Sequence, residues 1–195
     1  MARRVRRDYP LDMATVRPAT SDDAAAIGRI YVDSWRSTYA GLLPERLLLG
    51  MSSVRTAASF ARSVGRPGSG VLVAEWQKAG VVGFATAGPS RPGVRAAETY
   101  AGEVYTLYVD DDFRGLGLGR ALLAAAFEDL GRVGAWSALV WVLAGNPARF
   151  FYEAMRGVRA AERQGRLAGA PIHEIAYGWA DTRQPLGRRT PLDAR

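Results

Sequence analysis

The sequence is poor in the residues that carry most redox and metal chemistry. It has no cysteine, and its 195 residues include a single histidine, His173. Without cysteine the chain has no disulfide, no thiolate nucleophile and no thiolate metal site. One histidine excludes a zinc site with several histidine ligands, so no metal is expected. A Ser-His-Asp triad would have to use His173.

Long apolar segments are also missing. No apolar run approaches the roughly 18 residues that indicate a membrane-spanning helix. The arginines near the N-terminus are not followed by the apolar segment of a secretory signal. We therefore expect a cytoplasmic protein with no membrane partner, and the absence of cysteine is compatible with a reducing compartment.

Positive charge is concentrated at the two ends of the chain. The net charge is +7, to which residues 1–12 contribute +2 and residues 183–195 contribute +3. The remaining +2 is spread over residues 13–182, so the body of the chain is nearly balanced. Ends rich in arginine, proline and glycine are more typical of solvated tails than of a nucleic-acid site. Nucleic acid is therefore not the expected partner.

One stretch, residues 103–123, combines a strand, an acidic turn, closely spaced glycines and a helix. The run from Val104 to Val109 is β-branched and aromatic, which favours a strand. Gly115, Gly117 and Gly119 then precede an apolar helical run. Glycines let the backbone approach a ligand closely, and a helix N-terminus presents unpaired N–H groups. This order suits a phosphate or pyrophosphate group. The alternative is a turn that only joins strand to helix.

The glycine spacing distinguishes between phosphate-binding patterns. A dinucleotide fold requires G-x-G-x-x-G, which no glycine of this run satisfies. A nucleoside-triphosphate loop requires a lysine after its last glycine, and the only lysine, Lys78, is far away. The chain instead carries R/Q-x-x-G-x-G/A, at Arg114, Gly117 and Gly119. With this motif the sequence resembles the GNAT superfamily of N-acetyltransferases, in which the loop holds the pyrophosphate of acetyl-coenzyme A.

The resemblance implies a fold and a donor site. The fold is α/β, with a mixed, mostly antiparallel central sheet that is flanked by helices and splayed between its fourth and fifth strands. Acetyl-CoA is the implied acyl donor. Its pantetheine arm would lie along the central strand, where a backbone N–H near Val109 polarises the thioester carbonyl. The implied cofactor-binding residues are Leu107, Tyr108, Val109, Arg114, Gly115, Leu116, Gly117, Leu118, Gly119, Arg120 and Asn146.

A tyrosine near the start of a later helix is the implied general acid. The family pattern N-x-x-A/S/R-x-x-F/L-Y-x-x-x-G is matched by Asn146 and Tyr152, with Gly157 one place later than usual. The resemblance implies that Tyr152 protonates the leaving thiolate. The alternative is an aromatic side chain that packs beside Phe150 and Phe151. Asn146 is also a good N-cap for this helix.

The general base is less well defined. Glu103 begins the central strand, and strand periodicity puts it on one face with Tyr105, Leu107 and Val109. A carboxylate there can take the proton of the amine through a water, with its pKa raised by partial burial. The alternative is an exposed glutamate at a strand end. His173 is the rival base.

An aromatic pair occurs in the segment IYVDSWRSTYAGLLPERLL. Trp35 and Tyr39 are four residues apart, which places them on one face of a continuous helix. The segment resembles a subgroup of bacterial GNAT proteins with the signature SW-x-x-x-Y-x-G-L-L-P. In that subgroup the aromatics line the acceptor pocket, so Trp35 and Tyr39 are the candidate substrate-binding residues. The alternative is that both are ordinary core aromatics.

The predicted elements follow the order strand, helices, hairpin, strand, helix, strand, helix, hairpin. The helix after the glycines is expected to stop at Gly131, and residues 165–171 are expected to form the turn of the last hairpin. We predict a flexible leader over residues 1–13, one domain over 14–180 and a flexible tail over 181–195.

The predicted function is direct transfer of an acetyl group from acetyl-CoA to the amine of a small molecule. Two alternatives stay open, a protein or peptide N-acetyltransferase and a non-catalytic acyl-CoA-binding regulator. The loop over residues 88–100 is a candidate cap for the acceptor site. A homodimer is compatible with the sequence.

Overall fold

A computed structural model of the chain describes residues 13–64, 70–93 and 99–187. Seven strands form one sheet in the order β1-β2-β3-β4-β5-β7-β6. The strands are β1 (Ala14–Pro18), β2 (Val71–Trp76), β3 (Gly80–Pro89), β4 (Gly102–Val109), β5 (Ala138–Leu143), β6 (Val158–Leu167) and β7 (Ala170–Trp179). The α-helices are α1 (Ala24–Thr38), α2 (Glu45–Leu49), α3 (Ser53–Ala61), α4 (Leu118–Arg132) and α5 (Ala148–Ala154).

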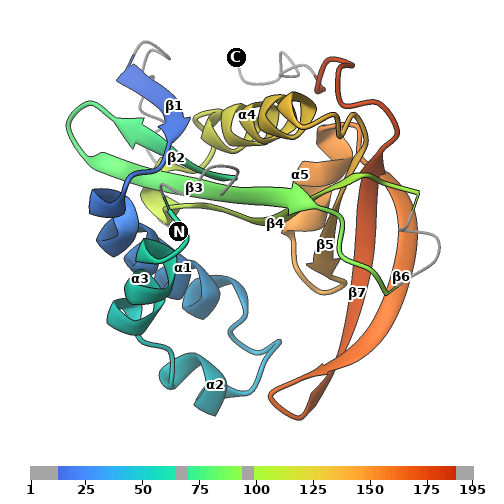
Figure 1. Cartoon of the computed structure of the whole chain (residues 1–195). Coiled ribbons are helices and arrows are strands. Elements are labelled where there is room, and N and C mark those ends of the chain that lie inside the picture. Colours follow the sequence, from blue (N-terminus) through green and yellow to red (C-terminus); the bar gives the residue numbers. More distant parts are fainter. Residues whose placement is uncertain (1–12, 65–69, 94–98, 188–195) are drawn as a thin grey trace, which may run out of the picture.

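Helices cover both faces of the sheet, α1 and α3 on one and α4 and α5 on the other (Figure 1). Phe84 and Ile30 belong to the apolar cluster on the α1 side, and Leu122 belongs to the larger cluster under α4. The long β6–β7 hairpin extends toward the α1–α2 connection (Figure 1), where Leu167 packs on the cluster that contains Leu48. The predicted α/β class and element order are confirmed. None of the described helices is long and apolar enough to cross a membrane.

The sheet is parted in its middle. β4 and β5 are its one parallel pair, and they pair only at Gly102↔Ala138 and Glu103↔Leu139. By contrast, β4 pairs with β3 along its whole length, as far as Val109. The splay predicted between the fourth and fifth strands is therefore confirmed. Beyond their first residues, the main-chain groups of β4 that face β5 are left without a strand partner.

A β-bulge in β4 shifts the alternation of its side chains. The pairing with β3 changes register, so that Tyr105 has no partner residue. Val104 and Val109 both pack in the cluster under α4, although strict alternation would put them on opposite faces. Leu107 packs against the same cluster. The prediction that Glu103 shares a face with Leu107 and Val109 is therefore wrong, because Glu103 precedes the bulge and lies opposite Val104.

The helix α4 passes through the glycine at which we expected it to stop. Gly131 lies inside α4, and a Cβ there would lie 2.4 Å from the ring of Trp136, so the glycine serves packing. The chain turns at Gly134, which has φ +83°. A positive φ is strained for residues with a side chain, so Gly134 is the residue that suits this turn.

The last hairpin is longer than predicted. β6 and β7 continue through most of residues 165–171 and are joined at Ala168 and Gly169, which both have positive φ as in a two-residue type I′ turn. The predicted start of the C-terminal tail, residue 181, is also too early. Leu186 is buried, and a Cβ on Gly187 would clash with a carbonyl of α5, so the chain packs on the domain up to this point. Residues 1–12 and 188–195 lie outside the described part.

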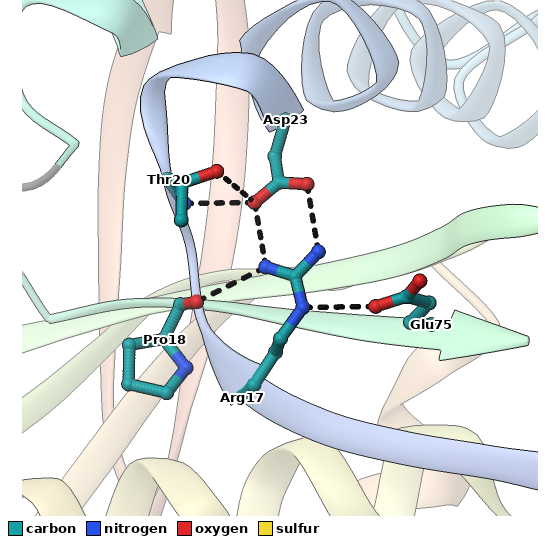
Figure 2. Close-up of polar contacts among 5 residues, drawn as sticks. All are labelled: Arg17, Pro18, Thr20, Asp23 and Glu75. Atoms are coloured by element: carbon teal, nitrogen blue, oxygen red, sulfur yellow. Dashed lines mark hydrogen bonds and ion pairs between the residues drawn. The ribbon is translucent and has the colours of Figure 1, made fainter.

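A charged network ties β1 to the start of α1 (Figure 2). The two Nη atoms of Arg17 donate to the two carboxylate oxygens of Asp23 at 2.8 and 3.0 Å, and its Nε donates to Glu75 at 2.9 Å. The backbone N–H of Thr20 donates to the same carboxylate of Asp23 at 2.7 Å. The Asp23 side chain is buried, and its hydrogen bonds to Arg17 lower its pKa below the usual value.

Replacing this carboxylate should make stability less dependent on pH. A group with a lowered folded pKa stabilises the protein above its unfolded pKa, about 3.9 for aspartate, and loses that effect as the pH falls through the folded value. We expect Asp23→Asn to lower the free energy of unfolding by about 1–3 kcal/mol at pH 7, and the deficit to shrink below about pH 4. Urea unfolding at several pH values measures this.

The matched control is Asp33→Asn. Asp33 is exposed and lies 3.9 Å from Arg29, so its loss should change stability by less than about 0.5 kcal/mol. An Asp23→Asn deficit that stays the same from pH 7 to pH 3 would contradict the assignment.

Candidate active site

A cavity of about 520 Å³ runs through the parting between β4 and β5. Its lining comes from both sides of the sheet. On the α4 side lie the glycine-rich loop, the first turn of α4, Leu107 and the start of α5. On the α1 side lie the end of α1 and the side chains of Tyr105, Thr106, Tyr108 and Trp141. We call these two parts the donor end and the acceptor end.

At the donor end the glycine-rich loop exposes a row of main-chain donors. Gly115 and Gly117 have φ values of +80° and +85°, which favour glycine. The first hydrogen bond of the α4 ladder runs from the N–H of Ala121 to the carbonyl of Gly117 at 3.0 Å. The N–H groups of residues 118–120 therefore have no acceptor within the helix and face the cavity entrance with the positive end of the helix dipole.

Most of the predicted donor residues meet at this end. Of the eleven implied cofactor residues, ten line the cavity: Leu107, Tyr108, Val109, Arg114, Gly115, Gly117, Leu118, Gly119, Arg120 and Asn146. The exception is Leu116, which packs against the cluster under α4. Leu107, Val109 and Tyr108 are brought there by the bulged strand, with Tyr108 turned toward the acceptor end.

Asn146 joins the start of α5 to α1. Its Oδ1 accepts the N–H of Ala148 at 2.8 Å, which is the predicted N-cap contact. Its Nδ2 donates to the hydroxyl of Tyr39 at 3.3 Å. Asn146 is buried, so both of its polar atoms are satisfied inside the protein. One amide side chain therefore fixes both the helix that carries Tyr152 and the aromatic wall of the acceptor end.

Tyr152 lies in α5 and lines the cavity where the two ends meet. The residue is buried, and its hydroxyl makes no hydrogen bond with another described residue. Burial raises the pKa of Tyr152 far above the usual tyrosine value, and a charge on nearby Tyr39 would raise it further. The hydroxyl of Tyr152 therefore stays protonated at ordinary pH.

Tyr39 stands at the centre of a cluster of tyrosines. Burial raises its pKa, and hydrogen bonds from Tyr108 and Asn146 oppose that rise. Burial likewise raises the pKa of Tyr31 to about 12 and that of Tyr108 well above the usual value. These side chains are neutral at ordinary pH, so they form an aromatic wall with hydroxyl groups and no charge.

Trp35 supports this wall from behind. Its ring stacks on Tyr31 with centroids 5.4 Å apart and meets Tyr39 edge-on at 5.0 Å. The predicted shared face of Trp35 and Tyr39 is therefore observed. Tyr39 lines the cavity, whereas Trp35 does not. The indole N–H of Trp35 is buried with no acceptor among the described residues.

The two candidate bases lie outside the cavity lining. Glu103 is 1% exposed, and its carboxylate accepts hydrogen bonds from the backbone N–H and the guanidinium of Arg91. His173 is on the β6–β7 hairpin, where its Nε2 lies 2.8 Å from Glu162. It alternates with Glu174 and so lies on the α5 face, away from Tyr39. Their roles as bases stay predictions.

Several residues of the cavity lining were not predicted from the sequence. Tyr105, Thr106 and Trp141 line the acceptor end, and no motif marks them. The bulge turns Tyr105 and Thr106 to the same face, which strict alternation does not predict. Within the described ranges, no group of three or more acidic or histidine side chains is arranged to hold a metal ion.

This arrangement is the one expected of a transferase that holds a phosphate-bearing donor on one face of a parted sheet and an acceptor on the other. Residues 29–158 match the model of the acetyltransferase (GNAT) family, so the chain belongs to that family. An uncharacterised N-acetyltransferase of Bacillus subtilis (strain 168), YuaI, is 38% identical over 170 residues, covering 87% of this chain and 94% of YuaI.

Solved structures share the fold. An N-acetyltransferase from Staphylococcus aureus Mu50 superposes with a TM-score of 0.65 at 23% identity, covering 87% of this chain and 99% of the other. The yncA protein from Salmonella typhimurium, solved with its cofactor acetyl-CoA, gives a TM-score of 0.60 at 23% identity, covering 86% and 93%. The predicted GNAT fold is thus confirmed.

Two glycines of the loop should respond differently to alanine. Gly117 has positive φ, so Gly117→Ala should lower the free energy of unfolding by about 1–2 kcal/mol and distort the loop. Gly119 is helical, and a Cβ there would make ordinary contacts of 3.4 Å with Phe151. Gly119→Ala should keep stability within about 1 kcal/mol. Chemical unfolding and acetyl-CoA titration measure both. Equal losses in the two variants would contradict this reading of the loop.

Proposed function

We propose that this protein transfers an acetyl group from acetyl-CoA directly to the amine of a small molecule. One observation carries the proposal: a single cavity crosses the parted sheet and joins the main-chain donors of the glycine-rich loop to the hydroxyl of Tyr152 and an aromatic acceptor wall. The acetyl-CoA held by the yncA structure supports the choice of donor.

The donor end is suited to position a thioester. The N–H groups at the start of α4, with the guanidinium groups of Arg114 and Arg120, would hold the pyrophosphate. Arg114 is fixed by Asp111 at 2.7 Å, which keeps its charge beside the loop. The unpaired edge of β4 near Val109 would take the pantetheine arm and direct a backbone N–H at the thioester carbonyl.

Tyr152 is the proposed general acid. Its hydroxyl lies in the cavity, is held by no protein acceptor among the described residues and keeps its proton because burial raises its pKa. When the thioester bond breaks, this hydroxyl would donate its proton to the departing sulfur. No protein nucleophile is required, because the amine attacks the carbonyl carbon itself. Glu103 stays the proposed base, acting through a water, and its ion pair with Arg91 gives it a competing role.

The acceptor end favours a small molecule over a polypeptide. The tip of the β6–β7 hairpin packs on α1 and α2 through Leu167, Ile172 and Leu43, which closes one side of that end. A polypeptide acceptor needs an open groove. We also assign the chain to the subgroup with the SW-x-x-x-Y-x-G-L-L-P signature, because Tyr39 lines the cavity and Trp35 supports it. The unengaged hydroxyl of Tyr152 favours an enzyme over a non-catalytic regulator.

Heat stability tests the choice of donor. Acetyl-CoA should raise the melting temperature in proportion to the logarithm of its concentration above the dissociation constant, because it binds only the folded state. NAD and ATP should cause no comparable rise, because the loop lacks their patterns. Differential scanning fluorimetry with the three ligands measures this. A rise with NAD and none with acetyl-CoA would refute the proposal.

Removing the hydroxyl of Tyr152 tests the general acid. Tyr152→Phe should lower kcat by about 100-fold or more, while the dissociation constant of acetyl-CoA changes little. The matched control is Tyr177→Phe. Tyr177 stacks on Tyr152 with centroids 6.3 Å apart, but its hydroxyl donates to Glu153 at 2.7 Å outside the cavity lining. The control should keep its kcat. An unchanged kcat in Tyr152→Phe would show that Tyr152 only packs.

A further inference from the structure

Two arginines, neither of which lines the cavity itself, stack on aromatic rings of the acceptor end. The guanidinium carbon of Arg91 is 4.8 Å from the ring centroid of Tyr105, and that of Arg163 is 4.1 Å from the ring centroid of Trp141. Both rings line the cavity. The arginines come from the β3–β4 loop and from β6, so the fold brings two separate segments to this rim. Each cation is stabilised by the face of its ring.

Arg91 is fixed by hydrogen bonds to Glu103, and its side chain is partly exposed. Its Nε and Nη2 both donate to Oε1 of Glu103, and its backbone N–H donates to Oε2 at 3.0 Å. Glu103 is 1% exposed, whereas the Arg91 side chain is 58% exposed. A guanidinium has five N–H donors, and Glu103 engages only one edge of it. No described residue accepts a hydrogen bond from the remaining donors, and the position of the cation is already fixed by Glu103.

Arg163 is likewise held by a carboxylate, that of Glu174. Its Nε donates to Glu174 at 2.7 Å, and its Nη atoms have no partner among the described residues. The charge of Glu174 also acts on Arg91 and on Tyr39, so the middle of β7 lies near both of them. The rim of the acceptor end therefore carries two oriented cations whose own carboxylates are already engaged.

The cavity itself offers nothing to a second cation. Among the described residues that line it, none is an aspartate or a glutamate. The carboxylates of Glu103 and Glu174 are already paired with Arg91 and Arg163, respectively. An acceptor with several ammonium groups would thus meet arginines and neutral tyrosines. An acceptor with an anionic group would meet two free guanidinium edges, whose geometry suits bidentate recognition of a carboxylate or a phosphate.

We propose that the acceptor amine carries a carboxylate or phosphate group, which Arg91 binds with Arg163 at the rim of the acceptor end. The apolar part of such a molecule lies against Tyr39, Tyr105 and Trp141, and its amine points through the parting toward Tyr152. Glu103 then has a positioning role beside its proposed role as base, because it holds Arg91 in place. This inference rests on the acetyltransferase function proposed above and names its substrate class.

Matched pairs of amines test the substrate class. Each amino acid is compared with the amine that lacks its carboxylate. A third compound carries a phosphonate in place of the carboxylate. Thiol release from acetyl-CoA gives kcat/KM, compared per deprotonated amine because the ammonium groups differ in pKa. We expect the anionic member of the preferred pair to exceed its neutral partner by about 10- to 100-fold, the usual effect of hydrogen bonds to a charged group. The phosphonate arm shows which anion is preferred.

Substitution of Arg91 tests the residue. Arg91→Gln should raise KM for the anionic acceptor by about tenfold or more, with little change in kcat and none with the neutral partner. The matched control is Arg166→Gln, which removes an exposed arginine on the same hairpin as Arg163. It should leave both acceptors unchanged. Melting temperatures with acetyl-CoA show whether each variant is folded.

Glu103→Gln separates its two roles. A positioning residue should raise KM for the anionic acceptor only, whereas a general base should lower kcat for both acceptors and remove the acidic limb of the pH profile. The inference would be overturned if the enzyme preferred the neutral amine in every pair, or if Arg91→Gln lost equal activity with both acceptors. Either result would leave the acetyltransferase function standing. Acetyl-CoA binding without acetylation of any amine would overturn both.

Discussion

The cavity of this protein exists because β4 and β5 stop pairing after their first two residues. The two strands pair at their first residues and then part, so the main-chain groups along the rest of β4 have no strand partner on that side. Unpaired main-chain groups are costly when they are buried, and a ligand that pairs with them is correspondingly favoured. The same parting lets one cavity reach both faces of the sheet. The glycine-rich loop, Tyr152 and the aromatic side chains of the acceptor end line this one cavity because the sheet is open and α5 covers it.

The walls of this opening are held by buried polar side chains that each join two elements. Asn146 hydrogen-bonds to the start of α5 and to Tyr39, so the position of Tyr152 is linked to that of the aromatic wall. Glu103 holds Arg91 of the β3–β4 loop against Tyr105. A buried carboxylate is tolerated only when it is paired and hydrogen-bonded, so this contact both fixes Arg91 and neutralises the charge of Glu103.

Much of the donor half followed from local sequence. Glycines at positive φ, an acidic turn and an apolar helix are neighbours in the chain, and their spacing alone predicts how the loop folds. Asn146 is likewise a local helix signal, confirmed by its contact with Ala148. The prediction from strand alternation was wrong in β4, because the bulge at Tyr105 depends on pairing with β3 and the sequence of β4 alone does not indicate it. Gly131 was misread for a similar reason, since its partner Trp136 is met only after the chain turns back.

The sequence by itself determined the fold class, the order of the elements and the residues of the phosphate loop, because each depends on neighbours in the chain. Only the tertiary structure decided which side chains line or border the acceptor end of the cavity. Tyr105, Trp141, Arg91 and Arg163 come from separate segments, and their meeting depends on the bulge, the parted sheet and the curve of the β6–β7 hairpin. Residues 103–123 therefore specify the glycine-rich loop and the strand before it, while long-range packing specifies the acceptor end of the cavity.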